Sequence, residues 1–259
     1  MGLVVLGAGG RLGRLIHDRM PVAARWLTRA DADVLDVGAL TAVLAPGDCV
    51  MCLAGVTPGG PGDMQDNVRI AAAVLDAAAA AGAGRVFLFS TAAVYGALPG
   101  PLTEDVPIAP LSPYGQAKVD MEHVAATHAH PSTVLRLGNV AGADAILGGW
   151  QSGFQLDVMA DGTTPRRSYI GPGALARVLA TLAQTPDVPP LMNLAAPGAV
   201  TMGDLLDAAG LAWTGRPATG NTLPNVTLDT TLLCRFTKMK PDDSTAQGIV
   251  ADWQKGVPA

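Results

Sequence analysis

Short, nearly continuous apolar segments alternate with longer alanine-rich segments through residues 1–140, and this alternation most limits the fold. Apolar runs without a polar face are typical of strands that are covered on both sides. The segments between them are long enough to form helices. The predicted strands are 2–7, 24–28, 49–55, 85–90 and 133–140, and the predicted helices are 11–20, 38–44, 63–82 and 113–128. The pattern predicts an α/β protein with a Rossmann-type, doubly wound parallel sheet.

After residue 142 the pattern becomes less regular and richer in Gly and Pro. We expect a helix near 175–184, a strand at 191–195 and a helix near 202–209. The sequence therefore predicts two parts. Residues 1–142 form a nucleotide-binding Rossmann domain, and residues 143–259 form a smaller substrate-binding lobe with segments that return to the sheet.

Composition and charge exclude several classes of function. The net charge is −5, and the 17 Lys and Arg residues are scattered, so nucleic-acid binding is not expected. The longest apolar stretch, 70–84, is mostly alanine and is interrupted by Asp76, so no membrane span is expected. The first residues lack the pattern of a secretory signal, and three sparse cysteines suit a reducing compartment. A cytoplasmic location is the expectation.

The sequence predicts no metal site. Cys49 and Cys52 form a C-x-x-C, but residues three apart in a strand point to opposite faces. His128 and His130 have no third ligand nearby in the sequence.

Glycines follow the first predicted strand and precede the first predicted helix. At this position glycines permit a tight turn and let the backbone approach a pyrophosphate. The segment "LGAGGRLG" therefore predicts a dinucleotide site formed by Gly7, Gly9, Gly10, Arg11, Leu12 and Gly13.

The end of the second predicted strand indicates which dinucleotide is bound. An NAD site favours a carboxylate here for the ribose 2′-hydroxyl, but this chain has Thr28 and Arg29. A guanidinium suits a 2′-phosphate, and Arg11 offers a second positive charge. The sequence thus predicts that NADP is preferred to NAD, although NAD also fits the glycine loop.

The segment "SPYGQAK" (112–118) places a tyrosine four residues before a lysine. Ser112 is a favourable N-cap and Pro113 a favourable first helical residue, so Tyr114 lies in the first turn. Lys118 then shares its helix face. A phenol has a pKa of about 10 and needs a nearby cation to act as a base at neutral pH. A surface pair of side chains is the alternative.

Taken in order, these motifs resemble the extended short-chain dehydrogenases/reductases of the NAD(P)-dependent epimerase/dehydratase family. The resemblance is carried by the glycine loop, "DVLDV" (33–37), "CLAG" (52–55), Asn67, "FSTAAVYG" (89–96), "SPYGQAK" and "LRLGNVAG" (135–142), and more weakly by "LMNLAAPGAVTMGDLL" (191–206). Together they cover more than half of the chain.

The resemblance implies a role for each matching residue. Tyr114 would be the catalytic acid/base, Lys118 its partner, and Thr91 the hydroxyl that orients the substrate oxygen. Further cofactor contacts would come from Thr28, Arg29, Asp36, Val37, Leu53, Ala54 and Gly55, with Tyr114 and Lys118 also facing the cofactor. Asp36 and Val37 would hold the adenine, and Asn67 would be a structural brace. Substrate contacts would come from Thr57, Tyr95, Asn139 and Arg167.

The resemblance also limits the chemistry. Family dehydratases carry an Asp-Glu pair after the catalytic threonine, whereas this chain has Ala92 and Ala93. Dehydration is therefore disfavoured, and epimerisation or carbonyl reduction remains, on a nucleotide sugar or a smaller carbonyl or hydroxyl compound. Gly171, Gly173 and Ala174 replace a His and two acidic residues of the family, which departs from a standard nucleotide-sugar pocket.

Two further expectations remain open. Some relatives of this fold bind the dinucleotide without catalysis and act as redox-sensing or assembly proteins, but they usually lack the Tyr-Lys pair. The resemblance also implies a homodimer through helices 63–82 and 113–128, although their apolar faces would equally serve the core.

Overall fold

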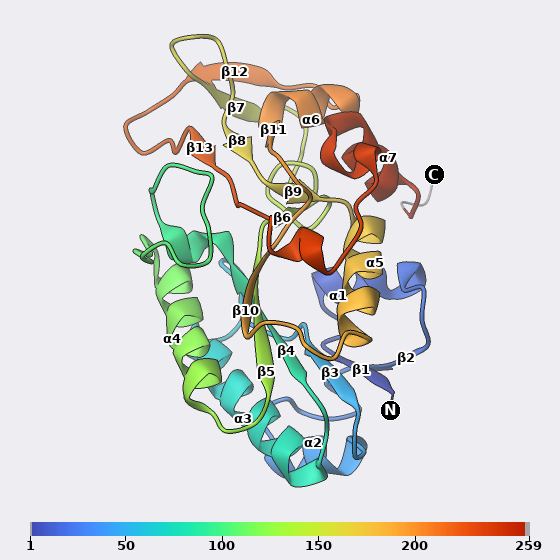
Figure 1. The fold of residues 1–259 in the computed structure, drawn as a ribbon. Helices are drawn as coiled ribbons and strands as arrows, with labels where there is room; N and C mark the ends of the chain where they lie inside the picture. The colour runs from blue at the N-terminus through green and yellow to red at the C-terminus, as the bar shows by residue number, and fades with distance from the viewer. Residues whose placement is uncertain (1, 257–259) are drawn as a thin grey trace.

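The computed structural model describes residues 2–256 and contains a central sheet of six strands (Figure 1). In sheet order they are β10 (Leu191–Leu194), β5 (Ser132–Leu137), β4 (Val86–Thr91), β3 (Cys49–Cys52), β1 (Leu3–Leu6) and β2 (Ala24–Leu27). Every neighbouring pair in this sheet is parallel. Each strand overlaps a predicted one, so the predicted fold class is confirmed.

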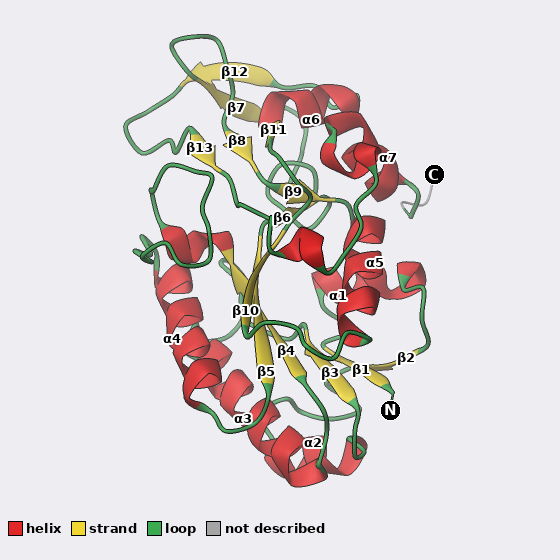
Figure 2. Cartoon of the chain, viewed as in Figure 1, coloured by secondary structure: helices red, strands yellow, loops and turns green. Residues whose placement is uncertain are grey.

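Helices cover both faces of the sheet (Figure 2). One face carries α1 (Arg11–Ile16) and α5 (Pro172–Ala183), and the other carries α2 (Val37–Val43), α3 (Asp66–Ala81) and α4 (Pro113–Thr127). Successive strand residues enter opposite layers: Val5 packs in the core with α1 and α5, and Val4 in the core with α2, α3 and α4. Burial on both faces explains why these strands lack alternating polar residues.

The two cysteines of β3 lie on opposite faces, as predicted. Cys49 packs in the core with α1 and α5, whereas Cys52 packs in the core with α2 and α3. Burial raises the pKa of Cys49 to about 12 and that of Cys52 to about 11. Both are therefore neutral thiols that cannot form a disulfide with each other.

The segments after residue 142 form small sheets and two more helices, and they also complete the central fold. The new elements are β6 (Asn139–Val140) with β9 (Tyr169–Ile170), β7 (Gln155–Val158) with β12 (Thr214–Pro217), β8 (Arg166–Arg167) between β11 (Val200–Thr201) and β13 (Asn225–Val226), α6 (Met202–Ala208) and α7 (Ala246–Gln254). Because β10 and α5 pack on the sheet, the boundary at residue 142 stays a prediction.

The glycines that depart from the family pattern at 171 and 173 make room for an acidic side chain from α7. Asp252 accepts hydrogen bonds from the backbone N–H groups of Gly173 and Ala174, each at 2.9 Å. A Cβ added at Gly171 or Gly173 would lie 2.4 Å from a carboxylate oxygen of Asp252. Asp252 thus caps the first turn of α5 from 79 positions away. The sequence patterns gave no sign of α7.

Replacing Asp252 by alanine is expected to lower the free energy of unfolding by about 1–2 kcal/mol, because two N–H groups of α5 lose their acceptor and the helix loses a favourable charge. Urea denaturation measures this change. Asp187→Ala, in the exposed loop after α5, is the control and should leave the midpoint unchanged. Equal midpoints for Asp252→Ala and the parent would contradict the capping role.

Candidate active site

The chain reverses direction across the sheet beside β1, and a cleft opens there. From β1 the chain moves outward to β2 and then crosses to β3 on the other side. At such a switch point the carboxyl ends of the strands diverge and leave a crevice. We call it the glycine-loop cleft. It has a volume of about 720 Å³ and is lined by Gly7, Gly9, Gly10, Thr28, Arg29, Ala30, Asp33, Val34, Leu35, Leu53, Ala54, Gly55, Val56, Pro61, Gly62, Asp66 and Ile70.

Two glycines of the loop have no room for a side chain. Gly7 has a φ of 88°, and a Cβ there would lie 2.6 Å from the backbone N of Ala54. A Cβ on Gly13 would lie 2.6 Å from the carbonyl oxygens of Gly7 and Ala8. Gly9, by contrast, faces open space. The loop therefore packs closely on β3 and α1 and leaves its backbone uncovered toward the cleft.

The segment that follows β2 reaches the cleft with Asp33, Val34 and Leu35 rather than with the predicted Asp36 and Val37. Asp36 is the N-cap of α2, and its carboxylate accepts a hydrogen bond from the N–H of Ala39 at 3.0 Å. Helix capping thus takes the side chain of Asp36 away from the cleft, and its contact with the adenine stays a prediction.

The basic residues near the cleft are also separated by the structure. Arg29 lines the cleft; its side chain is 84% exposed and contacts Asp33 at 3.1 Å. The Arg11 side chain points elsewhere and donates to the carbonyl of Ala143 at 2.9 Å. Leu12 packs toward the core. Of the two predicted cations, Arg29 lines the cleft and Arg11 does not.

A second, smaller cavity lies at the carboxyl ends of β4 and β5. We call it the Thr91 cavity. It has a volume of about 230 Å³ and is lined by Thr91, Ala92, Ala93, Gly96, Leu137, Gly138, Asn139, Arg167, Ser168, Leu223, Val226 and Leu228. Asn139 and Arg167, two of the predicted substrate contacts, both face it. Arg167 is the one ionisable side chain in this lining, and burial lowers its pKa.

Local structure holds Tyr114 beside Thr91. Ser112 is the N-cap of α4, its Oγ accepts from the N–H of Gly115 at 3.1 Å, and Pro113 is the first helical residue, as predicted. A Cβ on Gly115 would lie 3.0 Å from the carbonyl oxygen of Ala93. The missing side chain allows the first turn of α4 to approach the residues that follow β4.

Lys118 is buried and lines neither of the two hollows. It is 6% exposed, and its Nζ lies 6.0 Å from the ring centre of Tyr114 and donates to the carbonyl of Phe89 at 2.8 Å. On the cleft side, a Cβ added to Gly55 would lie 3.4 Å from this Nζ. Gly55, which lines the glycine-loop cleft, therefore lies next to the ammonium group.

The acid–base properties of the pair follow from burial. Burial raises the pKa of Tyr114, and the Thr91 hydroxyl lowers it in part. Burial also lowers the pKa of Lys118 to about 8. At neutral pH the phenol keeps its proton and the lysine keeps its charge, so the site holds a proton donor beside a cation.

Asn67, which begins the second turn of the predicted long helix, is a structural brace as expected. Its Nδ2 donates to the carbonyls of Val56 and Met64, each at 3.0 Å, and its Oδ1 accepts from the N–H of Val56 at 3.2 Å. The loop after β3 is thereby tied to α3. A Cβ on Gly55 would lie 2.8 Å from this Oδ1, so the brace also excludes side chains from the cleft wall.

Two predicted substrate contacts, Tyr95 and Thr57, lie outside both hollows. Tyr95 is fully buried in a side cluster of the core, and its hydroxyl donates to Asn193 Oδ1 at 2.7 Å. Thr57 is exposed and lies in a turn outside both hollows, where its carbonyl accepts from Gly60. Tyr95 faces the interior because the short 3-10 helix η2 (Ala92–Tyr95) turns it away from the cavity.

Residues 2–256 contain no cluster of three or more His, Cys, Asp or Glu side chains that could hold a metal ion. Among the same residues, no helix has both the length and the apolar character needed to cross a membrane.

Comparison with protein families identifies the group to which these features belong. Residues 3–187, more than half of the chain, match the model of the NAD dependent epimerase/dehydratase family. The chain belongs to this family. The resemblance seen in the motifs is thereby confirmed.

Relatives within the epimerase/dehydratase family match over shorter stretches. The chain is 41% identical over 85 residues to a UDP-glucose 4-epimerase of Azospirillum brasilense and 39% identical over 88 residues to one of Corynebacterium glutamicum. These stretches cover 31% and 32% of this chain and 24% and 27% of the relatives. The matched segment thus spans about a quarter of each relative.

Solved structures show the same fold over the whole chain. One is a dTDP-4-dehydrorhamnose reductase of Clostridium acetobutylicum, with a TM-score of 0.78, 18% identity and coverage of 98% of this chain and 99% of that chain. Another is a UDP-glucose 4-epimerase of Thermus thermophilus in complex with NAD, with a TM-score of 0.75, 19% identity and coverage of 99% and 100%.

Other residues of the two hollows were missed by the sequence-based prediction. Val56, Pro61, Gly62, Asp66 and Ile70 reach the cleft from the loop and helix after β3, and Leu223, Val226 and Leu228 reach the Thr91 cavity from the C-terminal lobe. The family motifs contain none of them. The segment around residue 225 has no hydrophobic period that would have indicated a role.

Proposed function

We propose that this chain is a nicotinamide-dependent oxidoreductase or epimerase in which Tyr114 is the catalytic acid/base. One observation carries the proposal. Thr91 lines the Thr91 cavity and Tyr114 lies beside it, while Lys118 Nζ lies 6.0 Å from the Tyr114 ring centre and close to Gly55 of the glycine-loop cleft. A dinucleotide in the cleft and a hydroxyl or carbonyl group in the cavity would meet at these side chains.

The cleft suits a dinucleotide because the glycine loop and Gly55 have no side chains and leave their backbone uncovered. At Gly7, Gly13 and Gly55 a Cβ would also collide with neighbouring atoms. When bound, the nicotinamide supplies or accepts a hydride. In reduction, Tyr114 donates its proton to the substrate oxygen while the Thr91 hydroxyl holds that oxygen in place. In oxidation, Tyr114 accepts this proton, and the Lys118 ammonium stabilises the phenolate.

The Thr91 cavity supports a small reacting group rather than a large one. Its volume of about 230 Å³ lies below the range of about 300–1,000 Å³ that is usual for sites of drug-sized ligands. Arg167 supplies a cation for an anionic group such as a phosphate. Ala92 and Ala93 line the cavity without an acid or base, which supports epimerisation or carbonyl reduction over dehydration.

The proposal is tested by incubating the protein with NADPH or NADH and a panel of nucleotide sugars and small carbonyl compounds. Oxidation of the cofactor, or epimerisation of a nucleotide sugar, is the expected result. A different result would favour a non-catalytic NADP-binding protein. In that case the protein binds the cofactor tightly but turns over no compound, and substitutions at Tyr114 do not affect its function in cells.

We also propose that NADP is preferred to NAD, through Arg29. Arg29→Ala is expected to weaken NADPH binding by roughly tenfold or more, since a hydrogen bond to a charged group contributes about 1.5–3 kcal/mol. NADH binding should stay the same, because NADH lacks the 2′-phosphate. Titration calorimetry with both cofactors measures the difference.

Arg216→Ala is the matched control. Arg216 also pairs with a single carboxylate, that of Asp157 at 2.6 Å, but lies in the C-terminal lobe away from the glycine-loop cleft. It should leave both affinities unchanged. NADH binding as tight as NADPH binding in the parent protein would contradict the preference.

A further inference from the structure

Glu122 lies two turns after Tyr114 on the buried face of α4. Residues at i, i+4 and i+8 share a helix face, so Tyr114, Lys118 and Glu122 form a row. Lys118 is 6% exposed and Glu122 is 9% exposed. Charged side chains are seldom buried without a partner, so we expect a counter-charge near this row and a role that explains its burial.

The row is bound to three successive residues of β4. Lys118 Nζ donates to the carbonyl of Phe89 at 2.8 Å, and the Ser90 hydroxyl donates to Glu122 Oε1. The next residue, Thr91, interacts with the phenol of Tyr114. These contacts set the position of α4 along β4, and with it the position of the phenol relative to the Thr91 hydroxyl.

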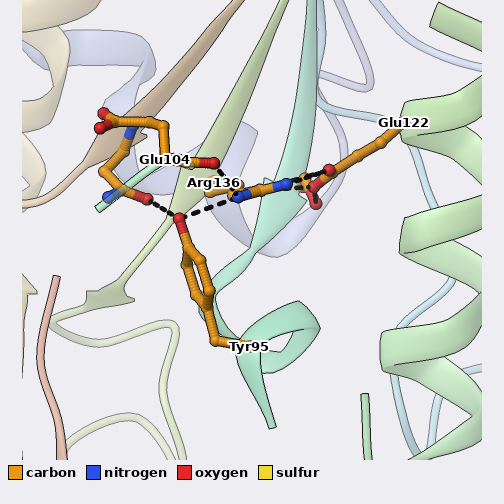
Figure 3. A network of polar contacts seen from close by, with 6 residues as sticks. Tyr95, Glu104, Glu122 and Arg136 are labelled. Carbon is orange, nitrogen blue, oxygen red and sulfur yellow. Dashed lines mark hydrogen bonds and ion pairs between the residues drawn. The ribbon is translucent and has the colours of Figure 1, made fainter. Parts of the chain in front are cut away.

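Arg136 of β5 neutralises Glu122 and continues the network (Figure 3). Its Nη2 donates to Glu122 Oε2 at 2.7 Å, and its Nε lies 3.1 and 3.2 Å from the two carboxylate oxygens. Its Nη1 donates to the Tyr95 hydroxyl at 3.0 Å and to the carbonyl of Glu104 at 3.1 Å. Tyr95 belongs to η2, whose first residues Ala92 and Ala93 line the Thr91 cavity.

We propose that the buried Glu122–Arg136 pair is a positioning device for the candidate active site. It holds α4 in register with β4 and keeps the Glu122 carboxylate one helical turn from the Lys118 ammonium. Neither residue faces either hollow, so both act through Lys118, Tyr114 and Thr91. The inference rests on the proposed function for its catalytic meaning, whereas its electrostatic part concerns Lys118 alone.

Burial and charge around Lys118 agree with this role. The titratable groups that face it are Cys52 of β3 and Tyr114 and Glu122 of α4. Burial raises the pKa of both Cys52 and Tyr114, so both are neutral near pH 7. The remaining group is Glu122, which is held in its ion pair with Arg136 of β5. Without its charge, the pKa of Lys118 falls further below its present value of about 8.

The test is an NMR titration of lysine-labelled protein without substrate. The chain has four lysines, and Lys118→Met assigns the signal of interest. Glu122→Gln is expected to raise the acid dissociation constant of Lys118 about tenfold, equal to a pKa lower by about one unit. Glu122→Gln/Arg136→Gln should also lower the pKa of Lys118, by less than Glu122→Gln alone because the Arg136 cation is removed too, and should be more stable than either single variant, because neither member of the pair is left buried without the other.

Two controls distinguish the effect of the Glu122 charge on the pKa of Lys118 from the effect of a general loosening of the fold. Arg136→Gln keeps the carboxylate and should not lower the pKa of Lys118. Asp120→Asn removes an outer carboxylate of α4 that accepts from Gln116, and should change nothing. The proposal would be overturned if the pKa of Lys118 were unchanged in both Glu122→Gln and the double variant. It would also be overturned if Arg136→Gln lowered this pKa as much as Glu122→Gln does.

Turnover provides the second measurement. In Glu122→Gln, the alkaline limb of the kcat/KM profile should move to lower pH by about one unit, because Lys118 loses its proton earlier. Two failures are distinguishable. If Glu122→Gln lowers the pKa of Lys118 but Tyr114→Phe is fully active, only the proposed function is contradicted. If Tyr114→Phe is inactive but the pKa of Lys118 is unchanged in Glu122→Gln, only the positioning role is contradicted.

Discussion

Tyr114→Phe should lower turnover by about 10²–10⁴-fold, the usual contribution of a positioned general acid or base. The phenylalanine ring keeps the packing of the first turn of α4 but has no proton to give or take. Thr91 and Lys118 remain in place and cannot replace it, because the Thr91 hydroxyl is a much weaker acid and Lys118 is held by the carbonyl of Phe89. Steady-state kinetics with a substrate found in the panel measures the loss.

Cofactor affinity separates chemistry from folding in this experiment. Tyr114→Phe should bind NADPH as tightly as the parent, since the glycine-loop cleft is lined by other residues. Tyr169→Phe is the matched control: Tyr169 is 1% exposed, and its hydroxyl donates to Asp144 at 2.6 Å. That variant should lose stability but keep turnover. Parent-like turnover in Tyr114→Phe would remove the catalytic role of this tyrosine.

Gly7→Ala should abolish measurable dinucleotide binding and destabilise the fold. Its φ of 88° is unfavourable for alanine, and the new Cβ would lie 2.6 Å from the backbone N of Ala54. Such backbone strain costs about 1–3 kcal/mol, and the loop must move away from β3 to relieve it. That movement closes or distorts the wall of the cleft. Thermal unfolding and cofactor titration together measure both effects.

Gly9→Ala provides a control in the same loop. A Cβ at Gly9 meets no neighbour within 4 Å, so this variant should unfold at the parent's temperature. Gly9 also lines the cleft, so a loss of cofactor affinity in this variant reports on the ligand and not on folding. Parent-like stability and cofactor binding in Gly7→Ala would contradict the role given to the turn.

Local patterns were sufficient for the features that depend on neighbours in the sequence. The apolar strands and the lengths of the helices predicted the sheet, because burial on both faces leaves no polar alternation. Ser112, Pro113 and the four-residue spacing placed Tyr114 and Lys118 correctly on one helix face, since capping and helical period act within one or two turns.

Local patterns were a poorer guide to the surroundings of a side chain where two local roles competed. Asp33 and Asp36 both fit the acidic motif after β2, and the choice depended on which of them caps α2. Tyr95 follows β4 as a substrate contact would, but η2 directs its ring toward Arg136 and Asn193. Both choices depend on how a loop turns, which hydrophobic period does not encode.

The sequence by itself determined the order of the elements, the glycine loop and the tyrosine–lysine spacing, because each depends on interactions within a few residues. The tertiary structure decided which side chains meet across long separations. It brought Asp252 to the first turn of α5 and Arg136 to Glu122, and it placed Asn139 and Arg167 in one cavity with Thr91. Such pairings follow from the packing of whole layers, and a single helix or strand carries no record of the partner it will contact.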